Sequence, residues 1–317
     1  MHSLYTYVAK ELLQLSSCYA PATKDQPILL FGSEVRRVST VLQVLHALKH
    51  HFCYGGDGDV TLVRAVRQQQ LLFLKQLLTS QDAGVLEDEC TALLNYLASA
   101  GQATANLLDV LELVNALLAE APASMVPAFD AKNGIRVLFT LVARSVQPST
   151  AACAAAADSA AHKHELRLLS LRVLASFLSR STAKRKQDTM SPANLFMLLA
   201  ELLAKTGPLD AQLYGALMEV AMEAPLGALR RGDAASLRLE NPMLVKVIAV
   251  LDKPPAVKRA FLKDLWRLLV ASRDNRRLLL QMSVWQQWLI ALLDDEHSAE
   301  VLALFKLLLY HALRWGE

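Results

Sequence analysis

The chain has 317 residues, of which 53% are hydrophobic, and it contains only 12 glycines and 11 prolines. This length corresponds to about two globular domains or one long repeat array, and it allows a large core without disulfide or metal staples. The net charge is +3, and residues 159–317 carry the basic excess, with 22 basic and 16 acidic side chains. This mild skew does not by itself favour nucleic acid as a partner.

Amphipathic helices are predicted from residue 34 onward. Residues 34–52 place valines and leucines on one stripe, and the sequence GGDGD at 55–59 ends that helix, with Asp59 as the cap of the next one at 60–80. Thr104, Ser191 and Ser298 stand where helix caps belong. The further helices are predicted at about 85–100, 104–120, 134–146, 164–181, 191–205, 209–223, 242–252, 255–271, 274–282, 284–293 and 298–315.

These helices have similar lengths and short connections, and no segment shows the alternation of a strand. Neighbouring helices recur in pairs at roughly 35–45 residues, within the range of armadillo and HEAT units. Because one such pair cannot bury its own apolar stripe, it must stack on the next pair. We therefore predict an all-α fold, a single armadillo/HEAT-like α-solenoid over residues 1–317.

Two segments interrupt the helical pattern. The alanine-rich sequence from 146 to 164 begins with Pro148 and has no apolar stripe to dock, so we predict a mobile loop at 147–161. The sequence RRGDAASLRLENP at 230–242 is interpreted as an ordered connector.

The sequence contains no recognisable catalytic motif, neither GxGxxG nor GxxxxGK[ST], GxSxG or HExxH. The adjacent His50 and His51 do not have the spacing of metal ligands on a helix, nor do His162 and His164. We interpret the former pair as exposed at a helix end and the latter as part of a loop. Acidic runs at 87–89 and 294–296 are read as solvated breaks between helices. We therefore predict a protein that is not an enzyme, with no cofactor, metal or small-molecule substrate.

The cellular setting follows from the cysteines and the chain's N-terminal sequence. The four cysteines never form a CxxC pair, which is typical of reduced, mostly buried thiols in an intracellular protein. The first residues lack the pattern of a signal peptide, and no apolar run approaches the ~20 residues that span a bilayer. We predict a cytoplasmic protein.

The most charged feature is the basic run STAKRKQD at 181–188, which includes Lys184, Arg185 and Lys186. It could contact phosphate or acidic lipid, serve as a nuclear address, or be the solvated C-terminal end of a helix. The last interpretation is favoured, because no aromatic residues interleave with the cations as they would in a nucleic-acid platform. These three residues are nevertheless a candidate interaction surface, and no nucleic-acid partner is expected.

Tryptophans gather near the C-terminal end. Trp266 is placed on an apolar stripe with Leu262, Leu265 and Leu269. Trp285 and Trp288 are three residues apart and therefore share one helix surface. We predict that both pack between the last helices, with an indole N–H donating to a carbonyl, and keep a ligand or partner surface as the alternative.

The sequence DNRRLLLQMSVWQQWLIALL resembles the end of the armadillo-like region of neurobeachin-type BEACH proteins. Residues 166–188 and 240–269 are similar to two preceding stretches of that family, and residues 1–160 fit it only as generic helical repeat. The residues that carry the resemblance at this end are Asn275, Arg276, Gln281, Trp285, Gln286, Trp288 and Leu289.

The resemblance implies a fragment or relative of large scaffolds for vesicle traffic and membrane-protein sorting. Other proteins are then the expected partners, and a peripheral position on endomembranes is compatible with it. One alternative is a peptide-binding armadillo adaptor, but the asparagines that would line its groove show no common period. Another alternative is a basic module for an anionic membrane surface or nucleic acid. The asparagines in question are Asn95, Asn106, Asn115, Asn133 and Asn194.

Overall fold

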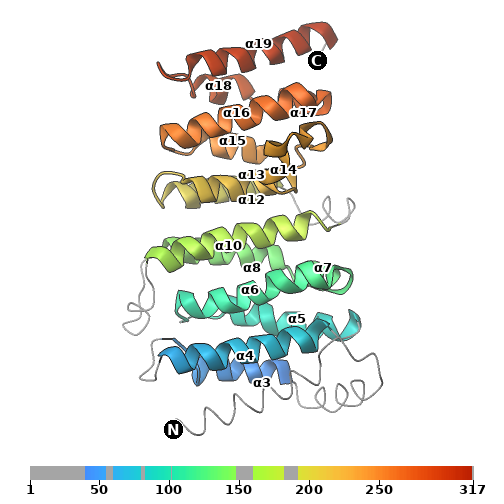
Figure 1. Ribbon diagram of the computed structural model, residues 1–317, viewed down its shortest axis with the longest axis vertical. Coiled ribbons are helices and arrows are strands. Elements are labelled where there is room, and N and C mark those ends of the chain that lie inside the picture. Colours follow the sequence, from blue (N-terminus) through green and yellow to red (C-terminus); the bar gives the residue numbers. More distant parts are fainter. Residues whose placement is uncertain are drawn as a thin grey trace. The chain divides into compact units, whose positions relative to one another are not determined.

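The computed structural model describes residues 40–54, 60–79, 83–100, 102–147, 160–181 and 192–315, which contain helices and no strand (Figure 1). The chain divides into two compact units, Met1–Val173 and Leu174–Glu317, and the boundary falls within α10 (Ala160–Leu178). The all-α class is confirmed, and the single solenoid over the full chain stays a prediction. No helix in the described part is long and apolar enough to cross a membrane.

The first unit packs its helices in two rows, in which neighbours are two or three elements apart along the chain. Its complete helices are α3 (Thr40–His50), α4 (Val60–Thr79), α5 (Ala83–Ala98), α6 (Thr104–Glu120), α7 (Pro122–Ala131) and α8 (Gly134–Val146). α3 packs against α5, α5 against α7 and α8, and α4 against α6, while α3 also touches α4 and α5 touches α6. Two rows of helices that bury their stripes on neighbours are the arrangement of an α-solenoid.

The second unit also packs helices that lie two or three elements apart along the chain. α12 and α13 both pack against α15, α15 packs against α18, and α16 packs against α17 and α19 (Figure 1). α14 contributes a further contact to α16. The helices are α12 (Pro192–Ala204), α13 (Ala211–Met222), α14 (Leu226–Arg231), α15 (Met243–Val250), α16 (Pro255–Ala271), α17 (Arg273–Leu280), α18 (Trp285–Ile290) and α19 (Ser298–Trp315), with a 3-10 turn at Asp233–Ser236.

The periodicity located most of these helices, four of them with the predicted bounds: 104–120, 134–146, 255–271 and 298–315. α7 was not predicted, because Pro127 lies inside it and interrupts the helical pattern that the sequence shows. The mobile loop predicted at 147–161 is wrong at its end, since Ala160 and Ala161 belong to α10. Residues 148–159 of that loop, and the expected caps Asp59 and Ser191, lie outside the described residues.

Two of the expected caps are instead the first residues of their helices. Thr104 begins α6, whose cap position makes no side-chain hydrogen bond, and Ser298 begins α19. Side-chain caps occur at Asp210, which accepts from two amides at the start of α13, and at Ser272, which accepts from Asn275 N at the start of α17. These bonds satisfy amides that have no partner within the helix.

The structure places the paired histidines, the acidic runs and the predicted connector. His50 and His51 are exposed at the end of α3, as expected, but His162 and His164 lie within α10 and not in a loop. The acidic run at 87–89 lies within α5, and only the run at 294–296 separates two helices. Residues 232–242 form an ordered connector, whereas 230–231 still belong to α14.

A buried arginine ties the helices of the first unit together. The side chain of Arg67 on α4 is fully buried, and its Nε atom donates to Asp109 Oδ2 on α6 at 2.7 Å. Its Nη1 atom donates to the carbonyl oxygens of Leu48 at 2.9 Å and Phe52 at 2.8 Å. Its Nη2 atom donates to the carbonyl oxygen of Asn106 at 3.2 Å. One guanidinium therefore satisfies carbonyl oxygens at and just after the end of α3 and joins that helix to α4 and α6.

Cys90 on α5 is fully buried, and this burial raises the pKa of its thiol to about 12. Because the thiolate is the reactive form, we expect a variant that retains only Cys90 to be alkylated at pH 8 at least ~100-fold more slowly than one that retains only Cys53, which is partly exposed. The rates are measured with iodoacetamide, and they should converge in denaturant. Equal rates in the folded protein would contradict the buried position. Cys18 and Cys153 lie outside the described residues.

Candidate functional site

The two surfaces expected from the sequence have different outcomes. Lys184, Arg185 and Lys186 lie outside the described residues, so the basic run stays a prediction. Trp285 and Trp288 are both buried, with exposed fractions of 5% and 3%. Helix α18 packs against α15 and α19, which places these buried indoles between the last helices as predicted.

Both indoles are enclosed by protein. The ring centroid of Trp285 lies 5.6 Å from that of Phe305 on α19. The Nε1 atom of Trp288 is buried and has no hydrogen-bond partner, so the predicted bond to a carbonyl is wrong for this residue. These two tryptophans therefore hold α18 against its neighbours by packing, and neither offers its ring to solvent.

Asn275, another residue of the quoted motif, is buried and fastens the connector to α16. Its Oδ1 atom accepts from Leu239 N at 2.9 Å, and its Nδ2 atom donates to the carbonyl oxygens of Leu237 at 3.0 Å and Leu268 at 3.2 Å. The following residue, Arg276, donates to the carbonyl oxygen of Val270 at 3.2 Å. These two motif residues thus hold the connector and the end of α16 in place through hydrogen bonds to backbone groups.

Trp266 is not where the sequence placed it. Leu262, Leu265 and Leu269 are buried, with 1%, 0% and 0% exposed, but 40% of Trp266 is exposed. The buried stripe of α16 is centred on Phe261, Leu265 and Leu268, and on a helix of 3.6 residues per turn position 266 falls at its edge. The prediction that Trp266 is a core residue is therefore corrected.

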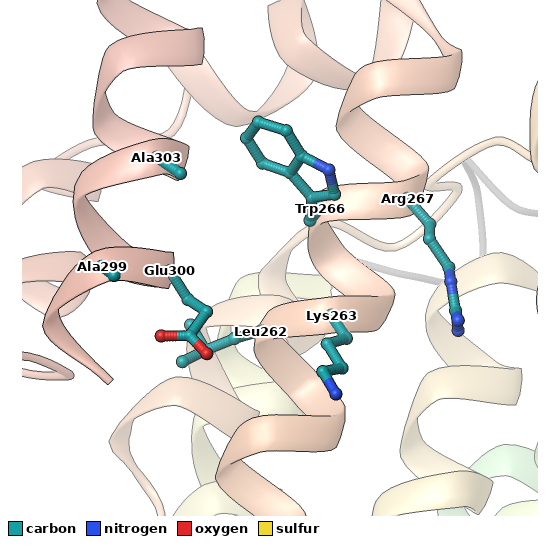
Figure 2. Close-up of a pocket in the computed structure, with 7 residues that line it drawn as sticks. All are labelled: Leu262, Lys263, Trp266, Arg267, Ala299, Glu300 and Ala303. Carbon is teal, nitrogen blue, oxygen red and sulfur yellow. The ribbon is translucent and has the colours of Figure 1, made fainter. Parts of the chain in front are cut away.

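The exposed indole forms one wall of a groove between α16 and α19 (Figure 2). The two helices lie side by side and run in the same direction, and the cavity between them has a volume of about 360 Å³. The indole of Trp266 extends toward the α19 side, where Ala303 faces it across the groove. The lining residues are Leu262, Lys263, Trp266 and Arg267 of α16 and Ala299, Glu300 and Ala303 of α19.

The groove exists because α19 presents small side chains opposite a large one. Ala299 and Ala303 are one helical turn apart and leave the space that longer side chains would fill. Leu262 is almost fully buried and closes the base. The floor and walls are therefore apolar, while the charged groups stand at the mouth.

Charges around the groove are unbalanced on the α16 side. The buried carboxylate of Asp264 accepts from Tyr214 Oη at 2.9 Å, from Arg230 Nη2 at 3.3 Å and from Arg267 Nη1 at 3.0 Å. Two guanidiniums thus share one carboxylate, which leaves one positive charge uncompensated. No ion pair among the described residues involves Lys263, so its ammonium adds a second uncompensated positive charge.

Ionic contacts fix the start of α19 relative to α16. Lys258 Nζ donates to Asp294 Oδ2 at 2.5 Å, and Arg259 pairs with Glu296. The hydrogen bond from Lys258 lowers the pKa of the Asp294 carboxyl below its usual value. Asp294 Oδ1 also accepts from the backbone N of the buried His297 at 2.7 Å. The two walls of the groove are therefore held in register from outside the groove itself.

The chemical capacity of the groove is that of a binding surface. Its lining offers one carboxylate and two cations, with no nucleophile beside a base. Among the residues that the structure describes, no three His, Cys, Asp or Glu side chains come together as metal ligands do. One sequence signal pointed to the groove without being recognised. Lys263 and Arg267 lie within one helical turn of Trp266, which indicates that the tryptophan borders the charged side of the helix.

The comparisons with known proteins place nearly all of the chain in one family. The model of the family described as Neurobeachin/BDCP, DUF4704 alpha solenoid region matches residues 23–316. The chain belongs to the neurobeachin alpha-solenoid family. The match includes the first half, which the sequence analysis could assign only to generic helical repeats.

Two relatives in this family are putative neurobeachin homologues from Caenorhabditis elegans and Caenorhabditis briggsae. Each is 32% identical to the chain over 350 residues. Each alignment includes 98% of this chain but only 13% of the relative. The chain thus corresponds to the helical scaffold region of a neurobeachin-type protein and to a small part of these relatives. No solved structure matches it.

Proposed function

We propose that this α-solenoid acts, without catalysis, in vesicle traffic and membrane-protein sorting by binding protein partners in the cytoplasm and at endomembranes. The observation that carries the proposal is the groove between α16 and α19, which exposes Trp266 on a scaffold of the neurobeachin family. Exposed tryptophans in concave apolar surfaces are frequent anchors of protein–protein interfaces.

Support for a protein partner comes from the character of the lining. A helical repeat array offers extended surfaces to other proteins, and its sites for them lie between stacked helices. An indole that is 40% exposed leaves apolar area in water that a partner would cover.

The proposal is tested by editing the gene in its own cells and measuring the surface proteome by biotinylation. A null allele and Trp266→Ala should both change the set of membrane proteins at the cell surface. Met197→Ala is the matched control, because Met197 has the same exposed fraction of 40% on α12. An unchanged surface proteome in the null allele would refute the role in sorting. A change in the null allele alone would refute the role of the groove.

A further inference from the structure

We infer that the groove between α16 and α19 receives a peptide segment of a partner protein that inserts a bulky apolar side chain against Trp266 and places an acidic side chain beside Lys263. The inference rests on the proposed function, because it names the chemistry of the partner at the same groove. The shape of the groove, its charge and the separation of its two kinds of contact support it.

The shape selects a side chain and not a flat surface. The cavity of about 360 Å³ lies between two helices, with Leu262 at its base and Ala303 opposite the indole (Figure 2). A bulky apolar side chain that enters this space contacts the indole, the leucine and the alanines at once. Removal of this apolar area from water favours binding.

The charge selects an acidic neighbour for that side chain. The α16 edge carries the unpaired ammonium of Lys263 and the uncompensated charge of the Arg230, Arg267 and Asp264 cluster. Glu300 is the opposing charge in the lining, and it stands in the first turn of α19, where a carboxylate stabilises the helix through its dipole. A partner carboxylate beside Lys263 therefore gains attraction from α16.

The separation of the contacts defines the length of the segment. Lys263 and Trp266 are three residues apart on α16, so their side chains emerge about 5–6 Å from each other. A short peptide segment spans this distance with an apolar and an acidic residue less than one helical turn apart. An anionic membrane fits less well, because the apolar atoms lie within a hollow that a flat lipid surface does not enter.

The test pans a phage-displayed library of random 16-residue peptides against the full chain and titrates synthetic copies of the enriched peptides. We expect the enriched sequences to share a bulky apolar residue and an Asp or Glu near it. Trp266→Ala should weaken their binding at least ~30-fold, as expected for an aromatic anchor. Lys263→Glu should weaken binding about 5–10-fold at low salt, with a smaller effect at ~0.5 M salt, because salt screens exposed charges.

Matched variants separate the groove from general surface effects. Met197→Ala and Lys205→Glu change an exposed apolar side chain and an exposed cation on or just after α12, and both should leave peptide affinity unchanged. Panning of the Lys263→Glu variant should shift the enriched peptides from acidic to neutral or basic residues at the same place. Unchanged circular dichroism and thermal unfolding show that each variant is folded.

Three results would overturn the inference. The first is that the library enriches no peptide beyond the level that the Trp266→Ala variant enriches. The others are that the enriched peptides are basic or purely apolar, and that their binding does not depend on Trp266. Trp266-dependent binding to vesicles of phosphatidylcholine and phosphatidylserine, without peptide binding, would assign the groove to a membrane. Trp266-dependent sorting in cells together with any of these results would leave the proposed function intact and refute only this partner chemistry.

Discussion

Replacement of Arg67 by methionine is expected to cost the first unit about 3–5 kcal/mol of its free energy of unfolding, because three carbonyl oxygens lose a buried donor at ~1–3 kcal/mol each. The methionine fills a similar volume but donates no hydrogen bond. The carbonyl oxygens of Leu48, Phe52 and Asn106 then lose the donor that the guanidinium supplies in the buried position. Asp109, whose side chain is 25% exposed, can recover water, so the carbonyls account for most of the loss.

The loss should be local to the first unit. Hydrogen exchange in Arg67→Met is expected to speed up across residues 40–120, while 255–315 exchange as in the wild type, because stability in a solenoid is a sum of terms between neighbours. Tryptophan fluorescence should not change, since all four tryptophans lie at or after residue 266. Arg136→Met is the control, because Arg136 on α8 is exposed. Unaltered exchange at residues 40–120 would show that the guanidinium is not needed to join α3, α4 and α6.

The second large effect is expected for Trp288→Ala. Truncation of a large side chain that is only 3% exposed leaves a cavity and costs ~3–5 kcal/mol. Exchange should accelerate across 255–315 and hardly change across 40–79, because the contacts of α18 are with α15 and α19. Trp288→Ala should weaken peptide binding in the groove only if the loss of packing at α18 also moves α19 away from α16.

Two further tryptophan variants test what each indole contributes to stability. Because Trp288 Nε1 has no hydrogen-bond partner, Trp288→Phe should retain more than half of the stability that alanine loses. Trp266→Ala should cost about 1 kcal/mol or less, since Trp266 is 40% exposed and at the edge of the buried stripe. A Trp266→Ala variant as unstable as Trp288→Ala would mean that the groove is part of the core.

Local periodicity was sufficient for the helices because each carries its own apolar stripe, and the stripe depends only on residues three and four apart. It failed at α7, where Pro127 interrupts a helix that tertiary contacts with α5 stabilise. It also failed for the alanine-rich residues at the start of α10, since alanine favours helix without showing which face is buried.

The burial of single residues could not be read from the sequence. Arg67 lies among polar residues of α4 and has the pattern of a surface cation, yet carbonyls from α3 and a carboxylate from α6 surround it. Trp266 has Leu262 and Leu269 at helical spacing on either side and still reaches solvent. In both cases a partner on another helix determines the environment of the side chain.

The sequence by itself determined the helical class, the position of most helices and, through the residues from Asn275 to Leu289, the resemblance to neurobeachin-type proteins. Only the tertiary structure decided that Trp266 lines a groove while Trp285 and Trp288 are buried. The physical reason is that the apolar stripe defines a helix's buried side only to within about one residue position, so a residue at the stripe's edge is assigned by its neighbours. For Trp266 those neighbours are Ala299 and Ala303, which are too small to cover the indole.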